Sequence, residues 1–116
     1  MLAVILGAFG AHALKAILAP DLLQSFETGV RYQFYHSFAL MVCGLVYAHN
    51  PIRAIRIAAN LFIAGIILFS GSIYTLVMLK SAGQIGLGGL GILTPLGGVF
   101  FITGWLLFVI GLLKKN

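Results

Sequence analysis

The chain has 116 residues, of which 61% are hydrophobic and only 8% are charged, and its mean hydropathy is +1.12. A soluble domain of this length needs far more charged residues to cover its surface. The composition therefore excludes an ordinary water-soluble domain and indicates helices that face lipid. Seven basic and two acidic residues give a net charge of +5, and the basic ones lie at the ends of apolar runs. This placement is typical of membrane anchors and argues against a nucleic-acid partner.

Residues 1–18 are predicted to form the first membrane span. The span is short, because a bilayer crossing needs about 20 apolar residues and His12 and Lys15 interrupt its last third. We therefore expect these two side chains in a polar pocket that faces the protein, or a true N-terminus that lies further upstream. No cleavable signal peptide is expected, because a basic n-region is absent from the start of the sequence.

The next segment combines an apolar face with a charged one. Apolar residues recur at every fourth position over 22–34, while Glu27 and Arg31 fall on another face. This pattern predicts an interfacial amphipathic helix that leads into a second span at 30–48, with a hinge at Thr28–Gly29. Glu27 precedes Arg31 by four residues, which is the favourable order for a helical ion pair.

Two further spans are predicted at 55–79 and 94–113. Asn50–Pro51 is expected to cap and begin the third helix, and Thr94–Pro95 to cap and begin the fourth. The glycine-rich stretch 80–91 between them is predicted to be a flexible or membrane-dipping connector. It is not expected to bind nucleotides, because no strand precedes it.

Small residues recur along these segments at helical spacing, every four residues in the first span and every seven in the third and fourth. Such seams allow two helices to approach closely, so the fourth helix is expected to pack on the third. The predicted helix-packing positions are Gly7, Ala11, Ala58, Gly65, Ser72, Gly97, Gly104 and Gly111. Trp105 and Cys43 are expected to be packing residues inside the spans.

The expected architecture is a single all-α domain over residues 1–116, with four transmembrane helices in a bundle. Four spans place the N-terminus, the 49–56 turn and the C-terminus on one side of the membrane. The basic residues divide into Arg53, Arg56, Lys114 and Lys115 on that side and Lys15, Arg31 and Lys80 on the other. The majority predicts that both termini are cytoplasmic.

The unusual polar residues are all expected near the other membrane face. They are His12, Lys15, Glu27, Arg31, Tyr32, Gln33, Tyr35, His36, Ser70, Ser72, Tyr74 and Lys80. Ionisable residues at membrane depth suggest a functional site. The first hypothesis is a non-enzymatic protein whose polar cluster binds lipid head groups or a partner membrane protein, with Tyr32, Tyr35 and His36 orienting the contact.

Other interpretations of the same cluster remain open. His12 and His36 are simply hydrogen-bonded packing residues, or they form the proton relay of a small transporter. Stand-alone transport is disfavoured, because Asp21 and Glu27 are both interfacial and no acidic residue lies at mid-depth. Nothing in the residue spacing selects a metal site, a cofactor or a catalytic group.

Four motifs carry a resemblance to a known family: GAFGAHALK (7–15), FETGVRYQFYH (26–36), FSGSIY (69–74), and LTPLGG (93–98) followed by Gly-Trp at 104–105. Together they resemble the small bacterial inner-membrane proteins of the YgdD and YwdK type, which have a eukaryotic transmembrane relative. The resemblance implies a four-span protein of the bacterial plasma membrane. It implies no biochemical activity, no cofactor and no catalytic residue, and leaves membrane lipids, a membrane-protein partner or a homo-oligomer as partners.

Overall fold

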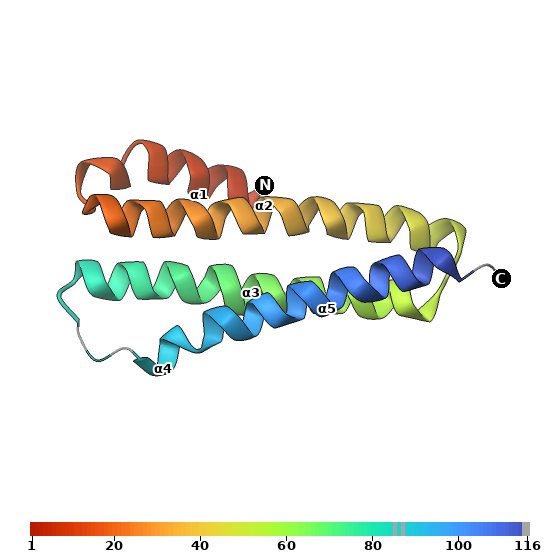
Figure 1. Cartoon of the computed structure of the whole chain (residues 1–116). Coiled ribbons are helices and arrows are strands. Elements are labelled where there is room, and N and C mark those ends of the chain that lie inside the picture. Colours follow the sequence, from red (N-terminus) through yellow and green to blue (C-terminus); the bar gives the residue numbers. More distant parts are fainter. Residues whose placement is uncertain (85, 87, 115–116) are drawn as a thin grey trace.

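The computed structural model describes residues 1–84, 86 and 88–114, and these residues form helices joined by short turns (Figure 1). Ile85 and Leu87, inside the predicted connector, and Lys115, one of the predicted cytoplasmic charges, lie outside the described residues. The elements are α1 (Leu2–Ala11), a 3-10 turn η1 (Leu14–Ala16), α2 (Pro20–His49), α3 (Arg53–Ser81), α4 (Gly88–Gly91) and α5 (Leu93–Leu113).

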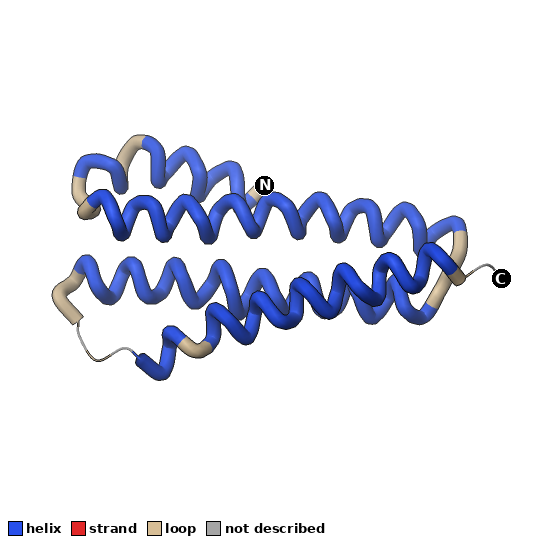
Figure 2. The backbone as a smooth tube through the Cα atoms, in the orientation of Figure 1, coloured by secondary structure: helices blue, strands red, loops and turns tan. Residues whose placement is uncertain are grey.

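α1, α2 and α3 lie side by side, and α5 crosses over α3 (Figures 1 and 2). α1 packs on α2, α2 packs on α3, and α3 packs on α5. The Cα positions extend over 54 × 29 × 14 Å. The helices form a bundle flattened into a slab, in which α1 covers only the N-terminal half of α2.

Two helical segments, α3 and α4–α5 (Gly88–Leu113), are long and apolar enough to cross a membrane, with mean hydropathies of 2.1 and 2.3. Large apolar side chains cover the outside of the slab. The exposed fraction lies between 61% and 65% at Phe38, Met41, Leu45, Ile67 and Ile102. An apolar outer surface of this extent suits lipid and not water. The structure thus supports a helical membrane protein.

The expected hinge at Thr28–Gly29 is wrong, because α2 continues unbroken from Pro20 to His49. The predicted interfacial segment and the second span are thus one helix. Gly29 serves close packing and not flexibility. A Cβ atom on Gly29 would lie 2.8 Å from the ring of Tyr74 in α3.

Three helix boundaries in the structure also differ from the predicted ones. The first helix ends at Ala11 and not near residue 18. Asn50 has an extended backbone and ends α2, while α3 begins two residues after Pro51. α5 begins at Leu93, ahead of the predicted Thr94–Pro95 cap. The Thr94 hydroxyl instead bonds to Ser72 of α3, so a contact between helices has replaced a local cap.

Glycine allows α3 and α5 to approach each other closely. A Cβ atom on Gly97 would lie 2.5 Å from the backbone nitrogen of Phe69, and one on Gly65 would lie 3.3 Å from the carbonyl oxygen of Gly97. A Cβ atom on Gly104 would lie 3.4 Å from the carbonyl oxygen of Ala58. The small residues spaced by seven in the two helices therefore face each other, as helices packed at backbone distance require.

The α1–α2 contact uses a different set of small residues from the predicted one. Ala3 is buried, but Ala11 is exposed. Gly10 takes the place expected for Ala11, because a Cβ atom there would lie 3.0 Å from the Phe26 ring. A Cβ atom on Gly7 would lie 3.4 Å from the Val30 side chain, which is an ordinary contact distance.

A pair of adjacent glycines tests this packing. Gly97→Ala places a methyl group against the Phe69 backbone, which cannot move aside, whereas nothing lies within 4 Å of a Cβ atom on Gly98. Gly97→Ala is expected to destabilise the protein by about 1–3 kcal/mol through overpacking. Gly98→Ala is expected to be neutral or slightly stabilising, since alanine favours helices. Thermal unfolding of the detergent-solubilised variants measures both, and equal melting temperatures would contradict the packing.

Candidate functional site

The structure divides the predicted polar cluster into two groups. The first, the outer cluster, is exposed on the slab and comprises His12, Lys15, Glu27, Arg31, Tyr32, Tyr35 and Lys80. The second, the inner network, lies between helices and comprises Gln33, His36, Ser70, Ser72 and Tyr74. Tyr32 belongs to both in part, because its backbone carbonyl reaches the inner network while its side chain is 39% exposed.

Two hydrogen bonds of the inner network join α2 to α3. The Ser70 hydroxyl donates to the Gly29 carbonyl oxygen at 2.7 Å. One turn further along each helix, the Tyr74 hydroxyl donates to Oε1 of Gln33, also at 2.7 Å. Ser70 is 1% exposed, and water does not reach this position easily. These bonds therefore satisfy polar groups that neither lipid nor solvent can serve.

α5 is joined to the other two helices by side-chain hydrogen bonds. The hydroxyl oxygens of Ser72 and Thr94 lie 2.6 Å apart and connect α3 to α5. Trp105 of α5 donates its indole N–H to Nε2 of His36 in α2 at 3.1 Å. Each pair of neighbouring long helices is thus held by at least one hydrogen bond, in addition to the glycine contacts.

His36 is held on three sides. Its Nδ1 lies 2.7 Å from the Tyr32 carbonyl oxygen, and its ring stacks on Phe101 with a centroid separation of 3.5 Å and an angle of 8°. An indole N–H can only donate a hydrogen bond and a carbonyl oxygen can only accept one. Nε2 must therefore accept from Trp105, and Nδ1 must carry the proton that goes to Tyr32. The two partners select one neutral tautomer of His36.

His12 and His36 occupy different environments. His36 is 4% exposed and hydrogen-bonded, as the packing interpretation expected, although its partners are an indole and a carbonyl. His12 is exposed and makes no hydrogen bond within the described part of the chain, so its interpretation as a hydrogen-bonded packing residue is wrong. Both ring nitrogens of His36 already have partners. This arrangement suits a structural role and disfavours a relay between the two histidines.

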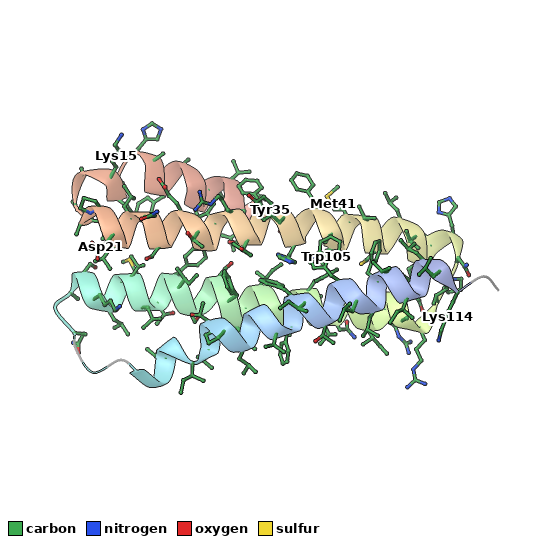
Figure 3. The ribbon with its side chains drawn as sticks, in the orientation of Figure 1. Lys15, Asp21, Tyr35, Met41, Trp105 and Lys114 are labelled. Carbon is green, nitrogen blue, oxygen red and sulfur yellow. The ribbon has the colours of Figure 1, made fainter. Side chains whose placement is uncertain are left out.

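The aromatic residues lie deeper than predicted. α2 has 30 residues, which at 1.5 Å per residue gives about 45 Å, the full thickness of a bilayer with its head groups. Tyr35 and His36 follow Pro20 by 15 and 16 residues, or about 23 Å, so they lie near the middle of α2. Figure 3 shows Tyr35 and Trp105 midway along the slab. Tyr35, His36 and Trp105 therefore lie midway between the two ends of the slab and not at one end.

Sequence reasoning missed Thr94 and Trp105 as members of the inner network. Thr94 was assigned to a helix cap, and Trp105 to apolar packing. One signal pointed to Trp105, since a tryptophan in the middle of an apolar span needs an acceptor for its indole N–H. Nothing in the spacing identified His36 as that acceptor, because the two residues are 69 positions apart.

The charges of the outer cluster are not paired with each other. Arg31 donates from Nη2 to the Thr28 hydroxyl of its own helix at 3.1 Å. No salt bridge forms within residues 1–84, 86 and 88–114, and Glu27 has no hydrogen-bonding partner there. The predicted Glu27–Arg31 ion pair is therefore wrong. Both charges face the surroundings of the protein.

A groove of about 290 Å³ runs beside these charges, between α1 and α2. Its apolar walls and floor are formed by Gly7, Gly10, Phe26, Val30 and Phe34, and Glu27 and Arg31 complete its lining. A smaller groove of about 110 Å³ lies between α2 and α3 next to Lys80. Apolar grooves with a few charged groups are the usual form of small-molecule sites.

The tautomer of His36 can be tested by ¹⁵N NMR of histidine-labelled protein in detergent. At neutral pH, Nδ1 of His36 is expected to be protonated and Nε2 to be unprotonated. Trp105→Phe removes the donor to Nε2 and is expected to shift that nitrogen signal and to lower stability by about 1–2 kcal/mol. His49, whose Nδ1 faces the Leu45 carbonyl on an exposed helix end, is the internal control. A protonated Nε2 in the unsubstituted protein would refute the assigned geometry.

Comparisons with known proteins also indicate a membrane protein. The family described as "Protein of unknown function (DUF423)" matches residues 6–98. UPF0382 membrane protein YwdK of Bacillus subtilis is 44% identical over 98% of this chain and 89% of its own length. UPF0382 membrane protein SAB0533 of Staphylococcus aureus is 42% identical over 98% of this chain and 88% of its own length. No solved structure is significantly similar. These matches confirm the resemblance drawn from the motifs: the chain belongs to the DUF423 (UPF0382) family of membrane proteins, whose function is unknown.

Proposed function

We propose that the protein is a non-enzymatic component of the bacterial plasma membrane that binds phospholipid head groups through its outer cluster. The observation that carries the proposal is that the basic side chains of this cluster are exposed at one end of the slab without a salt-bridge partner among the described residues. The buried polar groups of the inner network already have hydrogen-bond partners within the described residues, so the network offers no comparable binding site for a head group.

The proposal includes a membrane arrangement. α2, α3 and α5 cross the bilayer, and α1, with 10 residues or about 15 Å, enters it beside the N-terminal half of α2 as the fourth membrane-embedded segment. By the positive-inside rule, the α2–α3 turn and the C-terminus are cytoplasmic. Under this arrangement, the basic residues of the outer cluster lie in the leaflet away from the cytoplasm.

Charge and depth support a lipid phosphate as the ligand. Lys15 lies in η1, Lys80 lies in the last turn of α3, and Arg31 lies beside the groove between α1 and α2. These elements meet at the same end of the slab (Figure 1). A basic residue near a membrane surface contributes about 1 kcal/mol to binding of anionic lipid groups. Arg31 and Lys80 line apolar grooves, and Lys15 lies at the same end of the slab, so together they form a surface that suits lipid head groups.

The test is native mass spectrometry of the protein extracted gently from its own membrane. Phospholipid is expected to remain bound to the unsubstituted protein. Arg31→Ala and Lys15→Ala are each expected to reduce the bound fraction by about fivefold, the equivalent of about 1 kcal/mol. Arg53→Ala is the matched control, since Arg53 is also an exposed arginine and lies in the first turn of α3 at the opposite end.

Three outcomes would oppose the proposal. A protein that emerges without lipid would contradict it, and so would lipid that is retained equally by all variants. Stoichiometric recovery of a second protein, lost in Arg31→Ala, would replace lipid binding by a protein partner. A higher-order assembly of this chain that dissociates in Arg31→Ala would indicate a homo-oligomer.

A further inference from the structure

We propose that the groove between α1 and α2 selects phospholipids whose head group carries a primary ammonium beside its phosphate, as phosphatidylethanolamine does. One acyl chain lies in the groove, the phosphate contacts Arg31 and the ammonium contacts Glu27. This inference rests on the proposed lipid binding and adds a ligand class and a place.

The first argument is charge complementarity. Glu27 and Arg31 are four residues apart in α2, so their Cβ atoms are about 5–6 Å apart on the same side of the helix. They nevertheless do not pair with each other, and both line the groove. A phosphate joined to an ammonium through a two-carbon linker has the opposite charges at a similar spacing. Each charge of the protein would then meet a charge of the ligand.

The second argument is the shape and chemistry of the groove. Its volume of about 290 Å³ is close to the lower bound of about 300 Å³ for small-molecule sites. Apart from the two charged residues, its lining is apolar. The wall formed by α1 has no side chains at Gly7 and Gly10, which leaves space in the groove. An apolar channel that starts beside two opposite charges fits a lipid chain attached to a zwitterionic head group.

The third argument is depth. Glu27 and Arg31 follow Pro20 by 7 and 11 residues, so they lie about 11 and 17 Å along α2. The head-group layer occupies about 5–8 Å on each side of the bilayer. Glu27 therefore lies about 3–6 Å below the head-group layer and Arg31 about 9–12 Å below it, and their long side chains can extend toward the surface. Phe34 lies about 21 Å along α2. The groove thus runs from the head groups toward the bilayer centre, as an acyl chain does.

The carboxylate of Glu27 determines which head groups fit. A primary ammonium donates charge-assisted hydrogen bonds to a carboxylate. A glycerol head group brings no positive charge, so the lipid phosphate would face Glu27 without compensation. A trimethylated ammonium has no N–H to donate. The preferred ligand therefore carries a free amine.

The test reconstitutes the protein in nanodiscs that contain equimolar phosphatidylethanolamine and phosphatidylglycerol, followed by native mass spectrometry of the retained lipid. The unsubstituted protein is expected to retain phosphatidylethanolamine about fivefold over phosphatidylglycerol. Glu27→Gln keeps the size of an exposed side chain and removes its charge. It is expected to bring the ratio near one while the total amount of bound lipid stays the same.

A second pair of variants tests the groove itself. Gly7→Leu places a side chain in the groove and is expected to reduce bound phosphatidylethanolamine at least fivefold. Gly44→Leu is the matched control, because Gly44 is an exposed glycine of α2 with nothing within 4 Å of its Cβ position. Gly44→Leu is expected to retain lipid like the unsubstituted protein.

The outcomes separate this inference from the proposed function. Lipid that is bound without preference, and lost in Arg31→Ala, would overturn the inference and leave the proposed function intact. A preference that survives both Glu27→Gln and Gly7→Leu would place the selective site elsewhere and also overturn it. The absence of bound lipid in every sample would overturn both.

Discussion

Inside a bilayer, a buried polar group finds no water, so it must be satisfied by the protein itself. This constraint explains the inner network. Ser70 bonds to the α2 backbone, Tyr74 bonds to Gln33, and Trp105 bonds to His36. No buried side-chain nitrogen or oxygen lacks a partner within the described residues. The hydrogen bonds join the long helices at fixed register, and the charged side chains stay outside the network, exposed on the surface.

Close approach of the helix backbones makes this network possible. The hydrogen bond between Ser72 and Thr94 involves two short side chains, which reach each other only because Gly97 brings α5 against the backbone of α3. Gly29 likewise brings α2 next to Tyr74. The helices pack tightly against their neighbours and form a slab that exposes large apolar side chains. A lipid environment accepts such a surface, and water does not.

The polar residues therefore have separate roles. His36 was a candidate for proton transfer, but its two ring nitrogens are engaged by Tyr32 and Trp105, which makes it a structural link between α2 and α5. Glu27 and Arg31, which sequence reasoning paired with each other, are instead directed outward beside an apolar groove. This separation of inner and outer polar groups favours recognition of lipid over transport through the helices.

The sequence by itself determined the helical membrane class, the family and the small-residue spacing of α3 and α5, because composition and periodicity are local properties. Helix ends were predicted less well, since Asn50 and Thr94 match capping patterns but are used in a turn and in an interhelical bond. Only the tertiary structure showed that Gln33 belongs to the inner network and Arg31 to the outer cluster. These residues are two positions apart, and the direction in which each side chain points depends on where α1 and α3 pack against α2.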